Sequence, residues 1–283
     1  MTGLGGASPE RTADAVTGPD RTTSAAPPPD TTGFAAASSW PASVAAAAQV
    51  FVDDLAAVAV DADDHHHLLR VLRLRPGEVV VACDGTGRFR RCVVAGRGPE
   101  DLLRPEGPVV ACPRPPWPVT VAFVPVKGDR PDWVVQKLTE AGADRVVVLG
   151  SERAVVRWDG ERLQHHLQRL RRVARHAAAQ SRRPWVPEVA AAADLGQLDR
   201  LLGAGGTGGA PPGPLHLAQP GGDPPAAGLG AVAVGPEGGF SPAELAGRPL
   251  VGLGPGVLRA ETAAVAAGLL LCSLRDGVVD AVR

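Results

Sequence analysis

The second half of the chain alternates short apolar runs with helical patterns, and this alternation limits the possible folds more than any other feature. Residues 119–126 form a continuous apolar run of the kind found in buried parallel strands. Further strands are predicted at 145–149, 231–234 and 250–253. Helices are predicted between Asp129 and Gly142, over 161–180 and over 260–274. Such alternation is typical of an α/β domain with a mostly parallel sheet.

The longest predicted helix has two unlike sides. Apolar residues recur three and four positions apart, as on the buried side of a helix: Leu163, Leu167, Leu170, Val173, Ala174 and Ala177. The other side carries four arginines: Arg169, Arg171, Arg172 and Arg175. This arginine face is either solvated or directed at phosphate groups.

The first half of the chain predicts a tail followed by a small β module. Residues 1–48 contain few large apolar side chains, which predicts a disordered tail. Within 49–112, β-type runs at 78–82 and 88–94 flank the turn-forming pair Asp84 and Gly85, which predicts a hairpin in a small β-barrel. Prolines within 113–118 separate this module from the α/β domain, residues 118–283. A Gly/Pro-rich insertion at 203–228, with a short strand at 215–217, interrupts that domain.

The net charge of −1 conceals local imbalances. Residues 1–66 hold nine acidic residues against two arginines, a balance of −7. Residues 70–97 hold seven arginines against two acidic residues (+5), and residues 151–185 hold nine arginines against three (+6). Clustered cations attract phosphate backbones whatever their sequence, so both basic segments are candidates for contact with nucleic acid. On charge alone, a solvated arginine-rich surface is an equal alternative.

Other residue patterns predict a cytoplasmic protein without a metal site. The four cysteines are scattered without C-x-x-C spacing, as is usual for reduced thiols: Cys83, Cys92, Cys112 and Cys272. The histidine run 65–67 has no second ligand pair at zinc spacing. The longest clean apolar run, 263–274, is shorter than the roughly 20 residues that span a bilayer. The first residues lack the pattern of a secretory signal.

A glycine loop follows the predicted strand 231–234. It contains Gly235, Gly238 and Gly239 and leads to a helix start at Ser241. Ser241 as N-cap, proline at the next position and Glu244 three residues after the cap form a predicted capping box. Glycines let a backbone approach a ligand closely, and open α/β sheets bind ligands at the carboxyl ends of their strands. A tight turn without a ligand is the alternative, since the loop matches neither a dinucleotide nor a triphosphate motif.

A second glycine loop follows the predicted strand 250–253. Gly254 and Gly256 precede a helix start that carries Arg259, Glu261 and Thr262. An acidic residue in the first helical turn is favoured by the helix dipole. Charged residues among such apolar neighbours point to a role other than packing, although a helix-start carboxylate with a purely structural role is the alternative for Glu261.

In this order and spacing, the motifs resemble those of one family. They are Lys127, the segment 136–142 (QKLTEAG), 151–153 (SER), 180–183 (QSRR), 186–187 (VP), 235–239 (GPEGG) and 253–262 (LGPGVLRAET). The chain is similar to the bacterial small-subunit ribosomal RNA uracil-N3 methyltransferases, in the trefoil-knotted SPOUT superfamily. Residues 67–85 resemble the RNA-binding PUA-like barrel of that family. The resemblance covers about residues 49–283.

The resemblance implies a C-terminal trefoil-knotted SPOUT domain that binds S-adenosylmethionine, preceded by a PUA-like β-barrel. It also implies a homodimer with the active site near the subunit interface. The implied cofactor-binding residues are Leu217, Gly235, Glu237, Gly238, Gly239, Leu253, Gly254, Leu258 and Thr262. The chain departs from the family pattern at Gly256 and Ala260, where arginine and threonine are common.

The implied reaction is methyl transfer to N3 of a uridine in 16S ribosomal RNA, free or within the small-subunit particle. Arg153 and Arg259 are candidates for stabilising the uracil anion or anchoring its phosphate, and Glu261 is the candidate for orienting one of them. The candidate RNA contacts are Arg70, Arg73, Arg88, Lys127, Arg182 and Arg183. Two alternatives stay open. One is a SPOUT enzyme acting on a ribose 2′-hydroxyl or a transfer RNA, and the other is a non-catalytic RNA-binding assembly factor.

Overall fold

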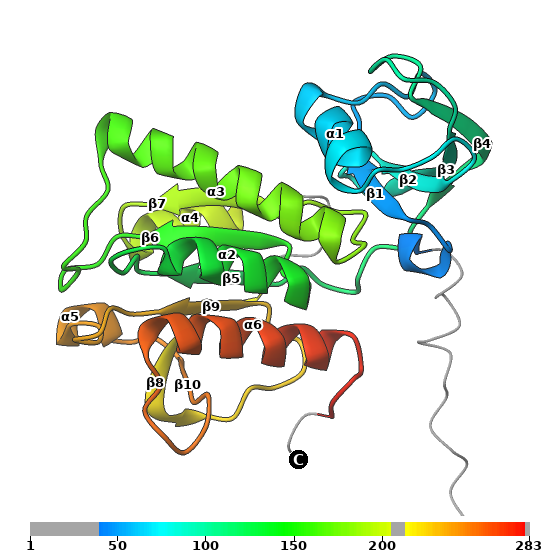
Figure 1. Ribbon diagram of the computed structural model, residues 1–283. Helices are drawn as coiled ribbons and strands as arrows, with labels where there is room; N and C mark the ends of the chain where they lie inside the picture. Colours follow the sequence, from blue (N-terminus) through cyan, green and yellow to red (C-terminus); the bar gives the residue numbers. More distant parts are fainter. Residues whose placement is uncertain (1–39, 205–212, 281–283) are drawn as a thin grey trace, which may run out of the picture. The chain divides into compact units, whose positions relative to one another are not determined.

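The computed structural model describes residues 40–204 and 213–280, which form two sheets (Figure 1). Most of the predicted tail (1–39) and part of the predicted insertion (205–212) lie outside the described residues. The first sheet has four strands in the order β1-β2-β3-β4, and the second has six in the order β10-β8-β9-β5-β6-β7.

The four-stranded sheet forms the β-barrel module. Its elements are η3 (Pro41–Ser43), β1 (Ala48–Phe51), α1 (Ala62–His66), the π-helical turn η4 (His67–Val71), β2 (Val79–Cys83), β3 (Arg88–Val94) and β4 (Leu103–Ala111). The predicted hairpin is confirmed, because β2 and β3 pair antiparallel on either side of Asp84 and Gly85. The Asp84 carboxylate accepts hydrogen bonds from the backbone N–H groups of Thr86 (2.8 Å) and Arg88 (3.0 Å), which fixes the turn.

Residues 40–48, which the sequence places in the tail, are part of the folded structure. Trp40 packs edge-on against Trp185, with ring centroids 5.3 Å apart. The Ala47 N–H donates to the Val79 carbonyl at 2.8 Å, which extends the pairing of β1 with β2. The short apolar residues of this segment therefore join a sheet edge, which composition alone does not predict.

The six-stranded sheet and its helices form the α/β domain. Its elements are β5 (Thr120–Phe123), α2 (Arg130–Ala141), β6 (Arg145–Leu149), α3 (Gly160–Gln180), β7 (Glu188–Ala192), α4 (Leu195–Gly203), β8 (His216–Asp223), β9 (Ala231–Val234), α5 (Pro242–Leu245), β10 (Leu250–Val251) and α6 (Ala260–Arg275). Each pair of neighbouring strands in this sheet is parallel, so the predicted parallel α/β domain is confirmed. The trefoil knot stays a prediction.

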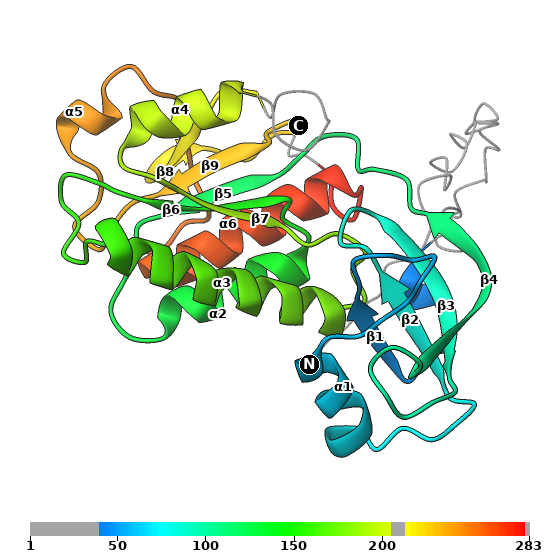
Figure 2. The same ribbon diagram turned by 90° about the horizontal axis from the view of Figure 1, so that it is seen from above.

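Alternate residues of the strands point to opposite faces of the sheet and bury two separate cores. Val121 and Phe123 of β5 belong to the core under α2, α3 and α6. Ala122 and Val124 belong to the core under α4 and α5. Figure 2 shows α4 on the opposite side of the sheet from α2 and α3. This double burial explains the continuous apolar runs that identify the strands in the sequence.

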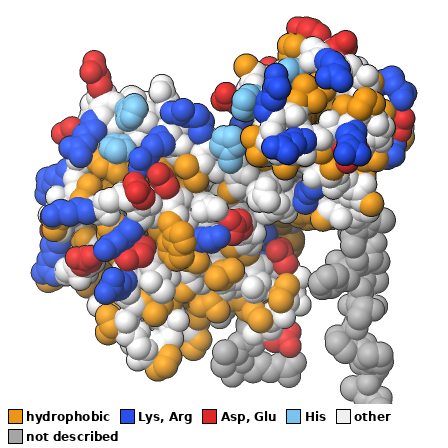
Figure 3. Space-filling model, viewed as in Figure 1, with side chains coloured by type: hydrophobic (Ala, Val, Ile, Leu, Met, Phe, Trp, Pro, Cys, Tyr) orange, Lys and Arg blue, Asp and Glu red, His pale blue; other side chains and the backbone are white. Residues whose placement is uncertain are grey.

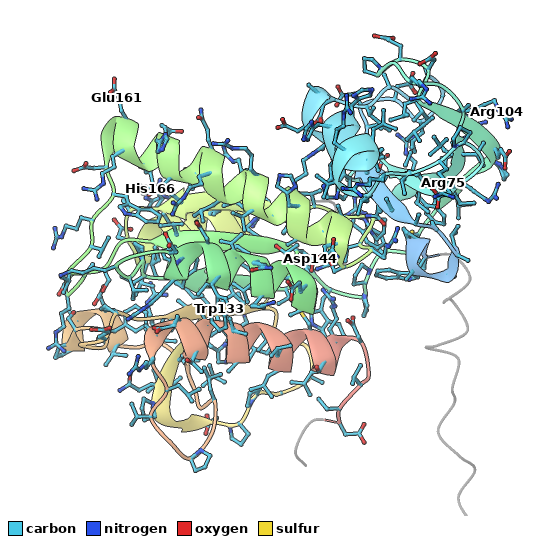
Figure 4. All side chains as sticks on the ribbon, in the orientation of Figure 1. Arg75, Arg104, Trp133, Asp144, Glu161 and His166 are labelled. Atoms are coloured by element: carbon cyan, nitrogen blue, oxygen red, sulfur yellow. The ribbon has the colours of Figure 1, made fainter. Side chains whose placement is uncertain are left out.

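Several helix ends follow the sequence signals. Gly142 ends α2 in the left-handed region, with φ of 113°, as its position after the last helical residue predicts. Asp129 is the N-cap residue of α2, but its side chain makes no capping hydrogen bond. Asp144, labelled in Figure 4, accepts from the Val119 N–H (2.8 Å) and from Arg275 Nη1 (2.7 Å), and so links the end of α6 to the start of the sheet.

The sequence missed β7 and α4 and treated β8 as part of an insertion. β7 is alanine-rich and has a single β-branched residue, Val189, where the other strands of the domain core have several. β8 contains proline and two glycines, yet it lies between β9 and β10 in the sheet. Over the described residues, the helices are too short or too polar to cross a membrane, and side chains of the metal-binding types do not gather into a cluster.

Candidate functional site

The two glycine loops come together at a cavity of about 740 Å³. It lies at the carboxyl ends of β9 and β10 and beside β8, where parallel α/β sheets place their ligands. Its wall consists of Arg130, Ala218, Gln219, Pro220, Val234, Gly235, Pro236, Glu237, Gly238, Gly239, Phe240, Leu253, Gly254, Gly256, Val257, Leu258, Arg259, Ala260 and Ala263. Its size falls in the range of small-molecule sites.

The first glycine loop is held at both ends. Ser241 Oγ accepts from the Glu244 N–H (3.1 Å), and the Glu244 carboxylate accepts from the Ser241 N–H (2.7 Å), so the predicted capping box is confirmed. At the other end, a Cβ on Gly235 would come within 3.1 Å of the Phe240 ring. Glycine at 235 therefore lets the buried Phe240 pack directly under the loop.

The loop after β6 braces the glycine loop from outside the cavity. Glu244 Oε1 accepts from the Glu152 N–H (3.1 Å). Arg153 Nη1 donates to the carbonyls of Gly238 (3.2 Å) and Phe240 (3.3 Å). Arg153 thus contacts the loop backbone rather than lining the cavity. Burial raises the pKa of Glu244, but the hydrogen bonds from the backbone N–H groups of Ser241 and Glu152 outweigh it and hold that pKa below its ordinary value.

The start of α6 brings three charged residues together. Arg130 Nη1 lies 3.4 Å from Glu261 Oε1 and 3.7 Å from Glu237 Oε1, and so connects α2, α6 and the glycine loop. The Glu261 side chain is 12% exposed, and its Oε2 is buried without a hydrogen-bond partner among the described residues. The sequence-based expectation that Glu261 orients Arg153 or Arg259 is not what the ion pairs show, because the partner of Glu261 is Arg130.

Arg259 is the N-cap residue of α6 and is exposed in the cavity wall. Its guanidinium pairs with no carboxylate in the described parts of the chain. A cation without a counter-ion, next to a cavity, can stabilise negative charge on a bound molecule.

Of the predicted cofactor-binding residues, seven line the cavity: Gly235, Glu237, Gly238, Gly239, Leu253, Gly254 and Leu258. Leu217 does not, because its side chain is fully buried in the core under α4. Thr262 is exposed and also lies outside the wall. The strand residues that do reach the cavity from β8 are the next three, Ala218 to Pro220.

The predicted RNA contacts divide into exposed and internal residues. Arg70, Arg73 and Lys127 are exposed, whereas the exposed Arg88 is paired with Asp84 at 2.7 Å. Arg182 donates to the Ala46 carbonyl (2.9 Å).

Arg183 is buried, and burial lowers its pKa. Its guanidinium donates to the carbonyls of Thr139 (2.6 Å), Gly142 (3.1 Å) and Ala143 (3.4 Å) at the end of α2. The guanidinium groups of Arg182 and Arg183 both donate to backbone carbonyls of the chain itself, so we do not retain these residues as RNA contacts.

Comparison with known proteins agrees with this geometry. The family model of an RNA methyltransferase domain matches residues 113–271, and that of an RNA methyltransferase PUA domain matches residues 60–103. The ribosomal RNA small subunit methyltransferase E of Mycobacterium tuberculosis is 42% identical over 229 residues, which cover 76% of this chain and 86% of the relative. The chain belongs to the ribosomal RNA small subunit methyltransferase E family.

Solved structures share the fold of this chain. A Legionella pneumophila protein described as a methyltransferase and solved with its bound cofactor S-adenosylmethionine aligns with a TM-score of 0.66 and 25% identity, over 81% of this chain and 97% of that one. The ribosomal RNA small subunit methyltransferase E of Neisseria gonorrhoeae, bound to S-adenosylmethionine, aligns with a TM-score of 0.62 and 24% identity, over 80% and 97% of the two chains.

Sequence reasoning missed Arg130 as a residue of the cavity wall. The only available signal is its place at the first position of a helix that follows a parallel strand, where side chains reach the ligand-binding edge of the sheet. Gln219 and Pro220 were missed because β8 has the composition of a loop.

Proposed function

We propose that this chain transfers a methyl group from S-adenosylmethionine to N3 of a uridine in 16S ribosomal RNA. The observation that carries the proposal is the cavity at the ends of β9 and β10, whose wall contains seven of the expected cofactor-binding residues. Membership of the methyltransferase E family supports the ribosomal RNA substrate. The relatives solved with bound S-adenosylmethionine support the cofactor.

The cavity suits S-adenosylmethionine in size and in chemistry. Leu253 and Val257 offer apolar surface for an adenine ring, and the glycine loop offers backbone amides and carbonyls without intervening side chains. Arg130 and Glu237 provide opposite charges for the carboxylate and ammonium of the amino-acid end. The cofactor, when bound, supplies an electrophilic methyl group on a positively charged sulfur.

Each charged residue of the site then has a separate role. Arg259 stabilises the negative charge that develops on the uracil as its N3 proton is lost. Arg153 holds the carbonyls of the glycine loop, so the cavity keeps its shape without reorganising. Arg130 pairs with Glu237 in the cavity wall and with Glu261 at the start of α6. Correct placement of the two reactants contributes much of the lowering of the barrier.

The substrate reaches the site on a basic surface. Arg70, Arg73 and Lys127 remain our candidates for phosphate contacts because they are exposed, and Arg88 joins them once it exchanges Asp84 for a phosphate. We propose free 16S ribosomal RNA or the small-subunit particle as partner, a cytoplasmic location and a homodimer as the active form.

Mass-spectrometric mapping of nucleosides in 16S ribosomal RNA, from cells with and without this gene, tests the function. We expect one 3-methyluridine to disappear without the gene and to return with the wild-type protein. Loss of a different methyl group from 16S ribosomal RNA would move the target to that position, for example a ribose 2′-hydroxyl, and loss of a methyl group from the transfer RNA of the same cells would make transfer RNA the target. If each methyl mark persists, the non-catalytic assembly factor becomes the better interpretation.

Substitution of Arg259 tests its catalytic role. We expect Arg259→Ala to lower turnover at least about tenfold, equivalent to ~1.4 kcal/mol, because the variant lacks the cation that stabilises the negative charge of the transition state. Arg200→Ala, at an exposed position of α4 away from the cavity, is the control. Turnover of Arg259→Ala close to that of the control would remove Arg259 from the mechanism.

A further inference from the structure

The face of α3 that points away from the core carries a row of arginine and histidine side chains. They recur at intervals of three and four residues, and we call them the α3 stripe: Arg162, His165, Arg169, Arg172 and His176. Residues at this spacing lie on one side of a helix. Leu167, Leu170 and Ala174 are buried on the opposite side.

The arginines of α3 are poorly matched by acidic residues. The helix contains five arginines and one acidic residue, Glu161 at its start. Arg169 pairs with Asp132 at 3.0 Å, and Arg175 lies 3.8 Å from Asp61 and 3.9 Å from Asp64. By contrast, the side chains of Arg162 and Arg172 are exposed and make no ion pair or hydrogen bond within residues 40–204 and 213–280.

This accumulation of positive charge is unfavourable for the helix itself. Like charges three or four residues apart, such as Arg169 and Arg172, destabilise a helix by roughly 0.2–0.5 kcal/mol per pair. A face that only needs to be soluble is usually built from both signs of charge. The stripe is therefore better explained by a ligand of negative charge than by solubility.

The stripe connects the cavity side of the domain to the barrel. α3 follows the loop in which Arg153 contacts the glycine loop. Near the other end of α3, Arg175 Nη2 donates to the Phe51 carbonyl of β1 (2.6 Å), and its guanidinium lies over the Phe51 ring. A helix of 21 residues is about 30 Å long. Glu161 and His166, labelled in Figure 4, mark its first half.

Figure 3 shows arginine and histidine side chains along the side of the molecule where α3 lies in Figure 1. From the charge, spacing and position of these residues, we propose that the α3 stripe binds the phosphate backbone of the RNA substrate between the barrel and the methyl-transfer cavity. The proposal rests on the proposed function. Guanidinium groups suit this role because they stay charged and match the geometry of phosphate oxygens.

The salt dependence of RNA binding tests the proposal. Binding of the full chain to 16S ribosomal RNA is measured by filter binding over a range of salt concentrations, for wild type and for the double variant Arg162→Gln/Arg172→Gln. We expect log K to depend less steeply on log salt concentration in the variant, by about 0.7–0.9 for each lost phosphate contact. Arg200→Gln, an exposed arginine of α4, is the control and keeps the wild-type slope.

A second variant separates charge from fold. Arg162→Lys/Arg172→Lys keeps the charge and should recover most of the wild-type slope, and the thermal unfolding midpoint and S-adenosylmethionine affinity of both double variants should match wild type. An unchanged slope in Arg162→Gln/Arg172→Gln would overturn the proposal that the α3 stripe binds RNA phosphates. An equal change of slope in Arg200→Gln would also overturn it, because the effect would then come from net charge.

The proposed function and the stripe fail in different ways. If the wild-type protein methylates 16S ribosomal RNA while the double variant binds it with an unchanged salt slope, only the proposal about the α3 stripe is wrong. If the wild-type protein neither binds nor methylates this RNA, both proposals fall. A double variant that binds RNA normally but loses an acidic protein partner would reassign the stripe to that partner.

Discussion

Arg130 is the cation that pairs with two acidic residues at the cavity, Glu237 and Glu261. It stands at the first position of α2, and its guanidinium lies between Glu261 at the start of α6 and Glu237 of the glycine loop. Without it, the nearly buried Glu261 carboxylate would face the cavity region without its cation. A buried charge that loses its partner is strongly disfavoured, although the 44% exposure of Arg130 reduces the cost here.

We therefore expect Arg130→Gln to weaken S-adenosylmethionine binding about tenfold, equivalent to ~1.4 kcal/mol, with a smaller effect on stability. Isothermal titration calorimetry measures the affinity, and thermal unfolding measures the stability. Arg248→Gln is a matched control because it removes an ion pair, to Asp199 at 2.7 Å, that lies outside this cavity. Equal affinities for the two variants would show that Arg130 does not contribute to S-adenosylmethionine binding.

At the residue scale, the sequence predicts which positions matter better than which partners they have. The glycines of both loops and Arg259 line one cavity, because both loops follow strands and precede helices. The pairing of Arg130 with Glu261 was not predictable from one sequence, because no local spacing relates residues so far apart. Arg183 was misjudged for a similar reason, since its burial depends on the end of α2.

At the scale of elements, α5 is a helix of only four residues that is held by its cap rather than by its length. Glu244 closes the capping box and also accepts from the loop after β6. Glutamine can still close a capping box, but it lacks the charge and has one acceptor oxygen for the two N–H groups of Ser241 and Glu152. We therefore expect Glu244→Gln to lower the free energy of unfolding by about 1 kcal/mol at neutral pH.

The effect of Glu244→Gln should depend on pH in a defined direction. Because the folded pKa of Glu244 lies below its ordinary value of 4.5, its ionised form contributes stability above that value, and the contribution is lost as the pH falls through the folded pKa. Denaturant unfolding at pH 7 and below pH 4 should therefore show a difference between wild type and variant that shrinks in acid. A difference that grows in acid would contradict the assigned hydrogen bonds.

Element prediction succeeded where local chemistry is strong. The strands predicted at 88–94, 145–149 and 231–234 have the predicted bounds. β7, α4 and most of β8 were not predicted, because their residues form neither β-branched runs nor a long helical period. These elements are defined by their contacts with the rest of the domain.

At the scale of the whole molecule, the barrel and the α/β domain share a packed cluster that the sequence does not predict. Phe89 and Val81 of the barrel pack with Ala178 and Trp185, from the end of α3 and the segment after it. Gln49 Nε2 donates to the Arg183 carbonyl at 2.7 Å. Contacts between residues this far apart in the chain follow from the assembled fold, so a single sequence carries no local signal for them.

Gly87 lies at the centre of this contact and gives the sharpest test of it. Its N–H donates to the Pro184 carbonyl (3.1 Å), its φ is 101°, and a Cβ there would overlap the Trp185 indole. Gly107 of β4 is a matched control, with φ of 81° and no atom within 4 Å of a Cβ. In both Gly→Ala variants the alanine must adopt a left-handed conformation, which destabilises the protein by roughly 1–2 kcal/mol. In Gly87→Ala the new methyl group also overlaps the Trp185 ring, and such overpacking typically costs about 1–3 kcal/mol more.

We expect Gly87→Ala to lower the unfolding free energy by about 1–3 kcal/mol more than Gly107→Ala, and to expose Trp185. Urea unfolding followed by tryptophan fluorescence measures both effects. If the barrel and the α/β domain are coupled through Trp185, the native-state fluorescence of Gly87→Ala shifts to longer wavelength before the main transition, whereas that of Gly107→Ala does not. Equal stabilities and equal spectra for the two variants would mean that Trp185 moves aside freely, and that this contact does not couple the barrel to the domain that holds the cavity.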